Sequence, residues 1–115
     1  MLNVGAAQMT NIGGLYSINV GASMTETIGK KLTIDAGDEI LIKTGSSSIL
    51  MKKDGTITIE GKVVTINGSD KVKVSAKSEL EMDGGKFELK AGTGQGSVTA
   101  STILEIKGAT VKINC

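Results

Sequence analysis

Apolar and polar residues alternate along most of this chain. Between Tyr16 and Lys43 the even positions are mainly apolar and the odd positions mainly polar. The apolar even positions are Tyr16, Ile18, Val20, Met24, Ile28, Leu32, Ile34, Ala36, Ile40 and Ile42. A period of two places the two sets of side chains on opposite faces of an extended strand. The pattern therefore predicts short strands with one buried face rather than helices.

Glycine divides these strands at a fixed interval of eight residues. Chance would place only about two of the 16 glycines on one such grid, whereas the grid holds Gly5, Gly13, Gly21, Gly29, Gly37, Gly45, Gly61 and Gly85. Because eight is even, the same parity stays buried across each glycine. We interpret each octad as a short strand followed by a corner, where glycine tolerates close approach or a positive φ.

The spacing loosens after Gly45, but apolar residues two positions apart continue. These pairs are Ile57/Ile59, Val64/Ile66, Val72/Val74, Leu80/Met82, Phe87/Leu89, Leu104/Ile106 and Val111/Ile113. We expect one domain over residues 1–115, because only the register of the pairs changes.

The Asp54–Gly55 dipeptide allows two interpretations. Asp-Gly between alternating runs is a strong hairpin signal, and the apolar pairs on either side fit a hairpin. A sharp corner in a continuing coil fits as well. We favour the corner, because both flanks continue the repeat.

The repeat also predicts how the chain becomes stable. One octad buries two or three aliphatic side chains, which contributes only a few kcal/mol at about 25 cal/mol per Å². Ordering its backbone costs roughly 1–2 kcal/mol per residue, so stacking must supply the difference. One chain could coil alone as a β-helix, or several chains could wind around one axis. We favour the second, because the apolar stripe is narrow and intertwined chains leave no open strand edge. The predicted fold is all-β: an intertwined triple-stranded β-helix, or β-prism, made by a parallel homotrimer.

Composition narrows the possible partners and chemistry. The net charge is +1, so nucleic acid is not an expected partner. No apolar run approaches the ~18 residues of a membrane span. Histidine is absent, and no nucleophile lies beside a base. The Gly-rich stretch "GTGQG" lacks the strand–helix context of a phosphate loop. We therefore expect no catalysis, no cofactor and no metal.

Two single residues carry separate expectations. Glu26 falls on the buried parity, either because the chain turns outward there, which we favour, or because three glutamates meet on an axis and raise one another's pKa. Cys115 is the only cysteine, so there is no disulfide framework. We expect it to be inert.

The segment "DAGDEILIKTGSSSILMKKDGTITIEGKVVTING" (35–68) resembles the C-terminal needle of VgrG proteins, which form the spike of the bacterial type VI secretion system. The closing "ILEIKGATVKIN" (103–114) resembles the distal end of that needle, and the octads are similar to those of a phage tail-spike needle. The resemblance implies a trimeric spike that a contracting sheath drives through the target cell membrane. It also implies that the tip, here Val111, Ile113 and Asn114, binds a PAAR-repeat protein and that effectors are carried along.

The resemblance has further implications. VgrG proteins carry large domains before the needle, so we expect this chain to be the C-terminal part of a longer spike protein. The N-terminal residues do not resemble a signal peptide, so we expect a cytoplasmic protein that is then delivered through the envelope. Two alternatives stay open: a needle fragment of a phage tail spike or fibre, and a monomeric β-helical adhesin.

Overall fold

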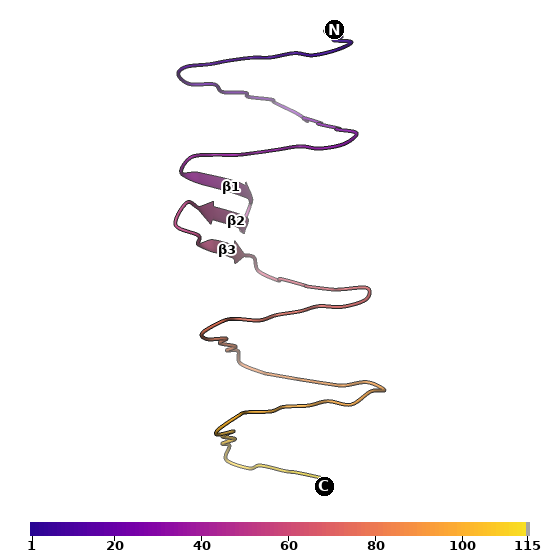
Figure 1. The fold of residues 1–115 in the computed structure, drawn as a ribbon, viewed down its shortest axis with the longest axis vertical. Coiled ribbons are helices and arrows are strands. Elements are labelled where there is room, and N and C mark those ends of the chain that lie inside the picture. The colour runs from indigo at the N-terminus through magenta and orange to yellow at the C-terminus, as the bar shows by residue number, and fades with distance from the viewer. Residues whose placement is uncertain (115) are drawn as a thin grey trace. The chain divides into compact units, whose positions relative to one another are not determined.

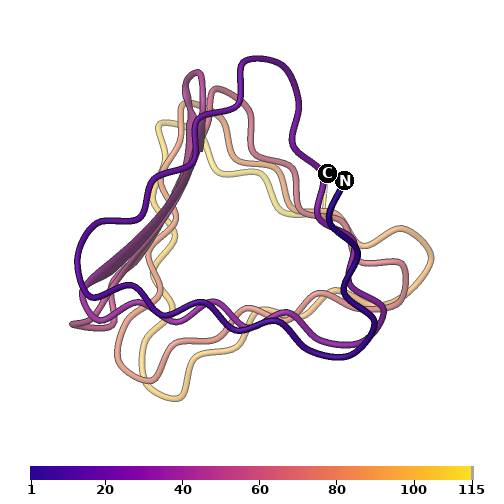
Figure 2. The same cartoon turned by 90° about the horizontal axis from the view of Figure 1, so that it is seen from above.

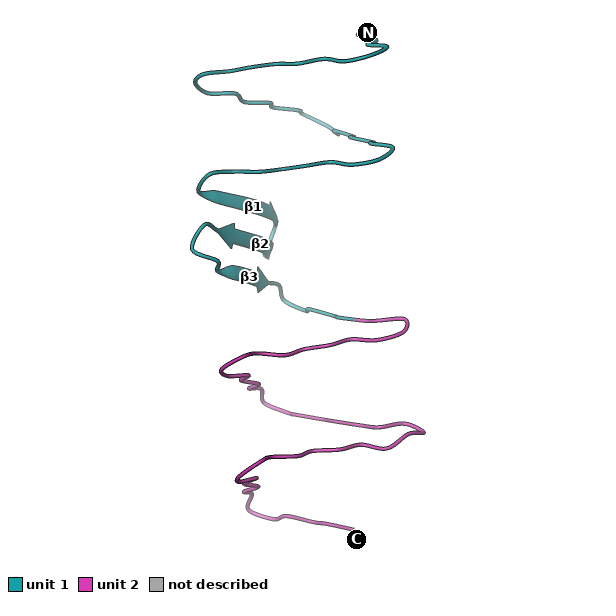
Figure 3. Ribbon diagram, viewed as in Figure 1, with its two compact units in different colours: residues 1–66 teal, residues 67–115 magenta. Residues whose placement is uncertain are grey.

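The computed structural model describes residues 1–114, and its regular structure consists of three strands. These are β1 (Glu39–Thr44), β2 (Ser47–Lys52) and β3 (Ile57–Glu60) (Figure 1). The other described residues form extended segments joined by bends, and none of them is helical. The prediction of an all-β protein is therefore confirmed. The chain falls into two units, residues 1–66, which contain the strands, and the part from residue 67 onward (Figure 3).

The three strands form an antiparallel meander in the order β1-β2-β3. Thr44 pairs with Ser47, so Gly45 and Ser46 form a two-residue turn between β1 and β2. Gly45 has a φ of 53°, which suits glycine at the first central position of a type II′ turn. Gly45, which the repeat had placed among the corners, thus lies where the chain reverses direction.

The turn from β2 to β3 corrects the interpretation of Asp54–Gly55. The Thr56 N–H donates to Asp54 Oδ1 at 2.9 Å, and the Gly55 N–H donates to the Lys52 carbonyl oxygen at 3.1 Å. Gly55 has a φ of 94°, a conformation that glycine adopts without steric cost. The favoured prediction of a corner is wrong. The segment is a hairpin, because the local hydrogen bonds of Asp-Gly reverse the chain.

The first turn also exchanges the parity of the apolar positions. The pairing of Ile42 with Ile49 joins an even position of β1 to an odd position of β2. The pairing of Ile49 with Ile59 then joins odd to odd. Six apolar residues of the three strands therefore share one face, although their sequence parity changes between Ile42 and Ile49, and the paired Leu41 and Leu50 lie on the other face.

Bends recur on the glycine grid. In the first unit, before β1, the backbone bends at residues 5–6, 13–14, 21–22, 29–30 and 37–38. In the second unit it bends at residues 69–70, 77–78, 85–86, 92–94, 101–102 and 109–110. Seen from above, nearly straight segments join these bends within each unit (Figure 2). Ser69, Lys77, Ser101 and Ala109 occupy grid positions in the second unit, so the bend itself does not require glycine.

Positive φ is not the reason for the remaining corner glycines. Among the described glycines, φ is positive only at Gly45 and Gly55, the two hairpin turns. At Gly5, Gly13, Gly21, Gly29, Gly37 and Gly85 an added Cβ would meet no atom of this chain within 4 Å. Neither backbone strain nor contacts within the chain explain glycine at these six positions.

Backbone hydrogen bonding is concentrated in the meander. Across residues 1–112, the backbone–backbone hydrogen bonds all fall between Asp38 and Glu60. The extended segments before and after it make no ladder within the chain. The N–H and C=O groups of residues 1–37 and 61–112 are thus available to water or to another chain.

We expect the β2–β3 turn to loosen in acid. The Thr56 N–H, followed by the Thr56 side chain, lowers the pKa of Asp54. A depressed carboxyl pKa contributes stability that is present above the unfolded-state value, about 3.9, and is lost as the pH falls through the folded-state value. An NMR titration should show the Thr56 amide resonance shifting with a midpoint below about 3.9.

The matched control is Asp54→Asn, which keeps an acceptor oxygen but does not titrate. Its Thr56 amide should not shift over the same pH range. A wild-type midpoint at or above the ordinary Asp value would contradict the assigned hydrogen bond.

Candidate functional site

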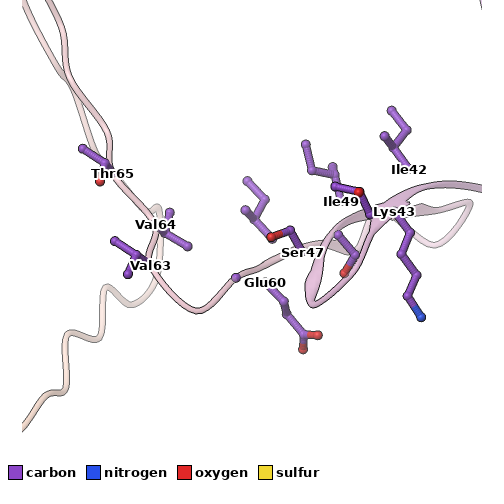
Figure 4. A pocket seen from close by; sticks show the side chains of 12 residues that line it. Ile42, Lys43, Ser47, Ile49, Glu60, Val63, Val64 and Thr65 are labelled. Atoms are coloured by element: carbon purple, nitrogen blue, oxygen red, sulfur yellow. The ribbon is translucent and has the colours of Figure 1, made fainter. Parts of the chain in front are cut away.

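One face of the meander carries two wholly apolar cross-strand rows beside a polar pair, Thr44 and Ser47. We call these two rows the apolar face. The rows are Ile40–Met51–Ile57 and Ile42–Ile49–Ile59. The opposite face presents Glu39, Leu41, Lys43, Ser48, Leu50, Lys52, Thr58 and Glu60. Figure 4 shows Ile42 and Ile49 pointing to one side of the sheet and Lys43 and Glu60 to the other.

No segment among the described residues covers the apolar face. Ile42, Ile57 and Ile59 keep exposures of 58%, 65% and 60%. Ile49 remains 40% exposed in the middle of the central strand. Apolar side chains stabilise a fold in proportion to the surface they remove from water, so this face contributes little to stability while it stays exposed.

Two solvent-open hollows lie at the two ends of the apolar face. The larger, about 400 Å³, is bounded by the row containing Ile42, Ile49 and Ile59 and by Val63 and Val64 (Figure 4). The smaller, about 110 Å³, is bordered by Ile40 and Met51 together with Ala36, Asp38, Glu39, Lys52 and Lys53. The hollows extend the apolar surface beyond the strands.

The lack of a core extends to the whole described chain. No described residue is buried, whether apolar or polar. The accessible surface is 12372 Å² for a mass of 11.8 kDa, whereas a compact monomer of this mass exposes about 5,900 Å². More than 6,000 Å² of surface is therefore exposed in excess of a compact fold.

The predicted tip residues lie in the second unit. Val111 and Ile113 are 49% and 77% exposed. Asn114 has a φ of 55°, a left-handed conformation that asparagine tolerates better than most residues. Neither the exposure nor the conformation of these residues tests binding of a PAAR-repeat protein, so the tip platform stays a prediction.

The structure bears on the expectation for Glu26 but not on the expectation for Cys115. Glu26 is exposed, but so are Met24 at 57% and Ile28 at 46% on the same parity. Exposure in one chain therefore does not separate an axial from an outward Glu26. Cys115 lies outside the described residues.

The charged groups form only surface pairs. Lys90 Nζ lies 2.8 Å from Glu88 Oε1, and Lys107 Nζ lies 2.6 Å from Glu105 Oε1. All four side chains are more than half exposed, and such pairs contribute about 0–1 kcal/mol. Within residues 1–114 no three potential ligands cluster as a metal site. No helix in that range has the length and apolar character to cross a bilayer.

Sequence reasoning missed the apolar face as a unit. The signal was the change of apolar parity between Ile42 and Ile49, which a two-residue turn at Gly45 requires. Together with Asp54–Gly55 it predicts two successive hairpins.

Comparison with known proteins identifies no relative: no protein-family model, curated protein or solved structure matches this chain. The likeness to spike proteins therefore depends on the sequence segments alone.

Two neighbouring residues test whether the apolar face is an interface. Leu41 and Ile42 are 54% and 58% exposed in one chain, and they lie on opposite faces of β1. If another chain covers the apolar face, Ile42→Ser should cost about 2–4 kcal/mol per copy. Leu41→Ser should cost about 0.5 kcal/mol. Denaturant unfolding of both variants measures the difference, and equal costs would show that the face is not covered.

Proposed function

We propose that this chain is the needle of a type VI secretion spike, in which three copies wind around one axis. The observation that carries the proposal is the missing core: none of residues 1–114 is buried, and the chain exposes about twice the surface of a compact monomer. A stable interface needs only about 800 Å² from each partner. Association is the direct way to cover this excess.

The unpaired backbone favours copies of the same chain as partners. In residues 1–37 and 61–112 the chain provides extended segments with free ladder groups and alternating side chains. A neighbour with the same spacing would pair with them and bury the same stripe. Winding around a common axis satisfies both requirements and leaves no open edge.

The periodic glycines support close approach between chains. At six corner glycines a Cβ added to the backbone would lie more than 4 Å from every atom of the chain outside the two adjacent residues. None of the six has a positive φ. Ser69, Lys77, Ser101 and Ala109 show that the bend accepts a side chain. A second backbone passing near the corners of residues 5–38 would explain why glycine, which has no side chain, occupies those corners.

The needle function follows from this architecture and the VgrG resemblance. A prism of hydrogen-bonded strands is stiff along its axis, and its unfolding would be slow because all copies share one core. The proposal makes the chain a mechanical part that is made in the cytoplasm, driven through the target envelope, and carries a PAAR-repeat protein and effectors.

Absolute mass in solution is the first test. Light scattering should give three times the 11.8 kDa chain mass, because only association covers the exposed surface. A mass of one chain would overturn the needle and favour the monomeric β-helical adhesin. A trimer that does not restore effector delivery when placed in a VgrG-deleted bacterium would favour a phage tail-spike or fibre fragment.

The tip is tested by its binding of a PAAR-repeat protein. Val111→Ser should reduce capture of that protein at least tenfold if Val111 belongs to an apolar platform. Lys112→Ser, at the adjacent position of opposite parity, is the matched control and should leave capture within twofold. Equal capture by wild type and both variants would contradict the tip assignment.

A further inference from the structure

We infer that the apolar face of the β1–β2–β3 meander docks on the same face of two further copies and sets the register of the three chains. The inference rests on the proposed homotrimer and deepens it. The occupant of the apolar face is thus another copy of this chain, and the docking decides which octads lie side by side.

The octads alone do not specify a register. A shift of one chain by eight residues superposes Gly13 on Gly5 and keeps the inward parity. The bends at 5–6, 13–14, 21–22, 29–30 and 37–38 repeat the same local geometry. Strand pairing is prone to slippage where the pattern is uniform, so a separate feature must distinguish the correct alignment.

The meander is the feature that occurs once. It carries two rows of three aliphatic or methionine side chains, whereas an octad carries a stripe on a single strand. A chain shifted by one octad would set this broad face partly against a neighbour's stripe and leave apolar side chains exposed. At about 1.5–3 kcal/mol for each fully buried aliphatic side chain, the aligned arrangement is favoured over the shifted one.

The hydrogen bonds of the meander do not involve a second chain. Its ladders, the Lys52–Thr56 bond at 3.0 Å and the bond from the Lys53 N–H to the Asp38 carbonyl oxygen at 3.0 Å all lie within one chain. Lys53 Nζ also reaches Asp38 Oδ1 at 3.1 Å. The geometry of the apolar face is therefore set within each chain, whereas the octads make no ladder of their own.

The composition of the two faces of the meander indicates which partner covers the apolar face. The opposite face mixes both charges, with Glu39 directly across from Lys52, and is suited to water. The apolar face has no charged residue and matches itself in composition. The bends at 37–38 and 69–70 lie on one octad grid, so aligning the meanders also aligns the repeats on both sides.

Distances between spin labels test the register. In a Cys115→Ser background, Thr27→Cys places one label on the polar parity of an octad. Wild-type meanders should give one short distance between the labels of assembled chains. Ile49→Ser, on the apolar face, should add longer distances from shifted chains, whereas Leu50→Ser, on the opposite face of β2, should not. A single distance in Ile49→Ser trimers, or equal slippage in both variants, would overturn the inference.

A second measurement uses an intact meander. A chain in which residues 21–28 are duplicated is co-expressed with the original chain, and both carry a label at Lys73→Cys. Alignment by the meander keeps the Lys73 labels at the distance found in unmixed trimers, and a longer distance would show that the N-terminal octads set the register. A mass of one chain in every sample would instead reject the homotrimer itself.

Discussion

An extended strand needs a partner for its backbone and a cover for its apolar side chains, and most of this chain has neither within itself. Outside residues 38–60 the described backbone through residue 112 makes no ladder, and no described side chain is buried. Both deficits accompany the octad pattern, because the segments joined by the bends at 5–6 through 37–38 form no ladder with one another. Within residues 1–114, a single chain thus leaves most of its backbone groups and all of its apolar side chains at least partly exposed.

The meander is the local exception, and turn chemistry produces it. Gly45 and Gly55 supply the two positive φ values, and the Asp54 carboxylate holds the second turn through the Thr56 amide. The result is a small sheet whose hydrogen bonds are complete while its apolar face is open. The segment therefore has a defined shape, and under the proposed assembly a neighbouring chain would cover its open face.

The sequence predicted the strands and the bends because both depend on spacing. Alternation around Ile18 and Ile34 indicated extended chain, and the bends at Gly5 through Gly37 fall on the glycine grid. The hairpin at Asp54–Gly55 was misjudged because the repeat on both sides was given more weight than a dipeptide with its own hydrogen bonds. Glu26 and the tip at Val111 could not be resolved, because their surroundings depend on chains that one sequence does not specify.

The position of the bends has a consequence for how such proteins change in length. The meander replaces a whole number of octads, since the bend at 69–70 stays in phase with the bend at 37–38. A deletion or duplication of eight residues would preserve both faces and every corner, whereas an odd number would turn the apolar stripe outward. The length of the protein can therefore change during evolution in steps of eight residues without loss of the pattern.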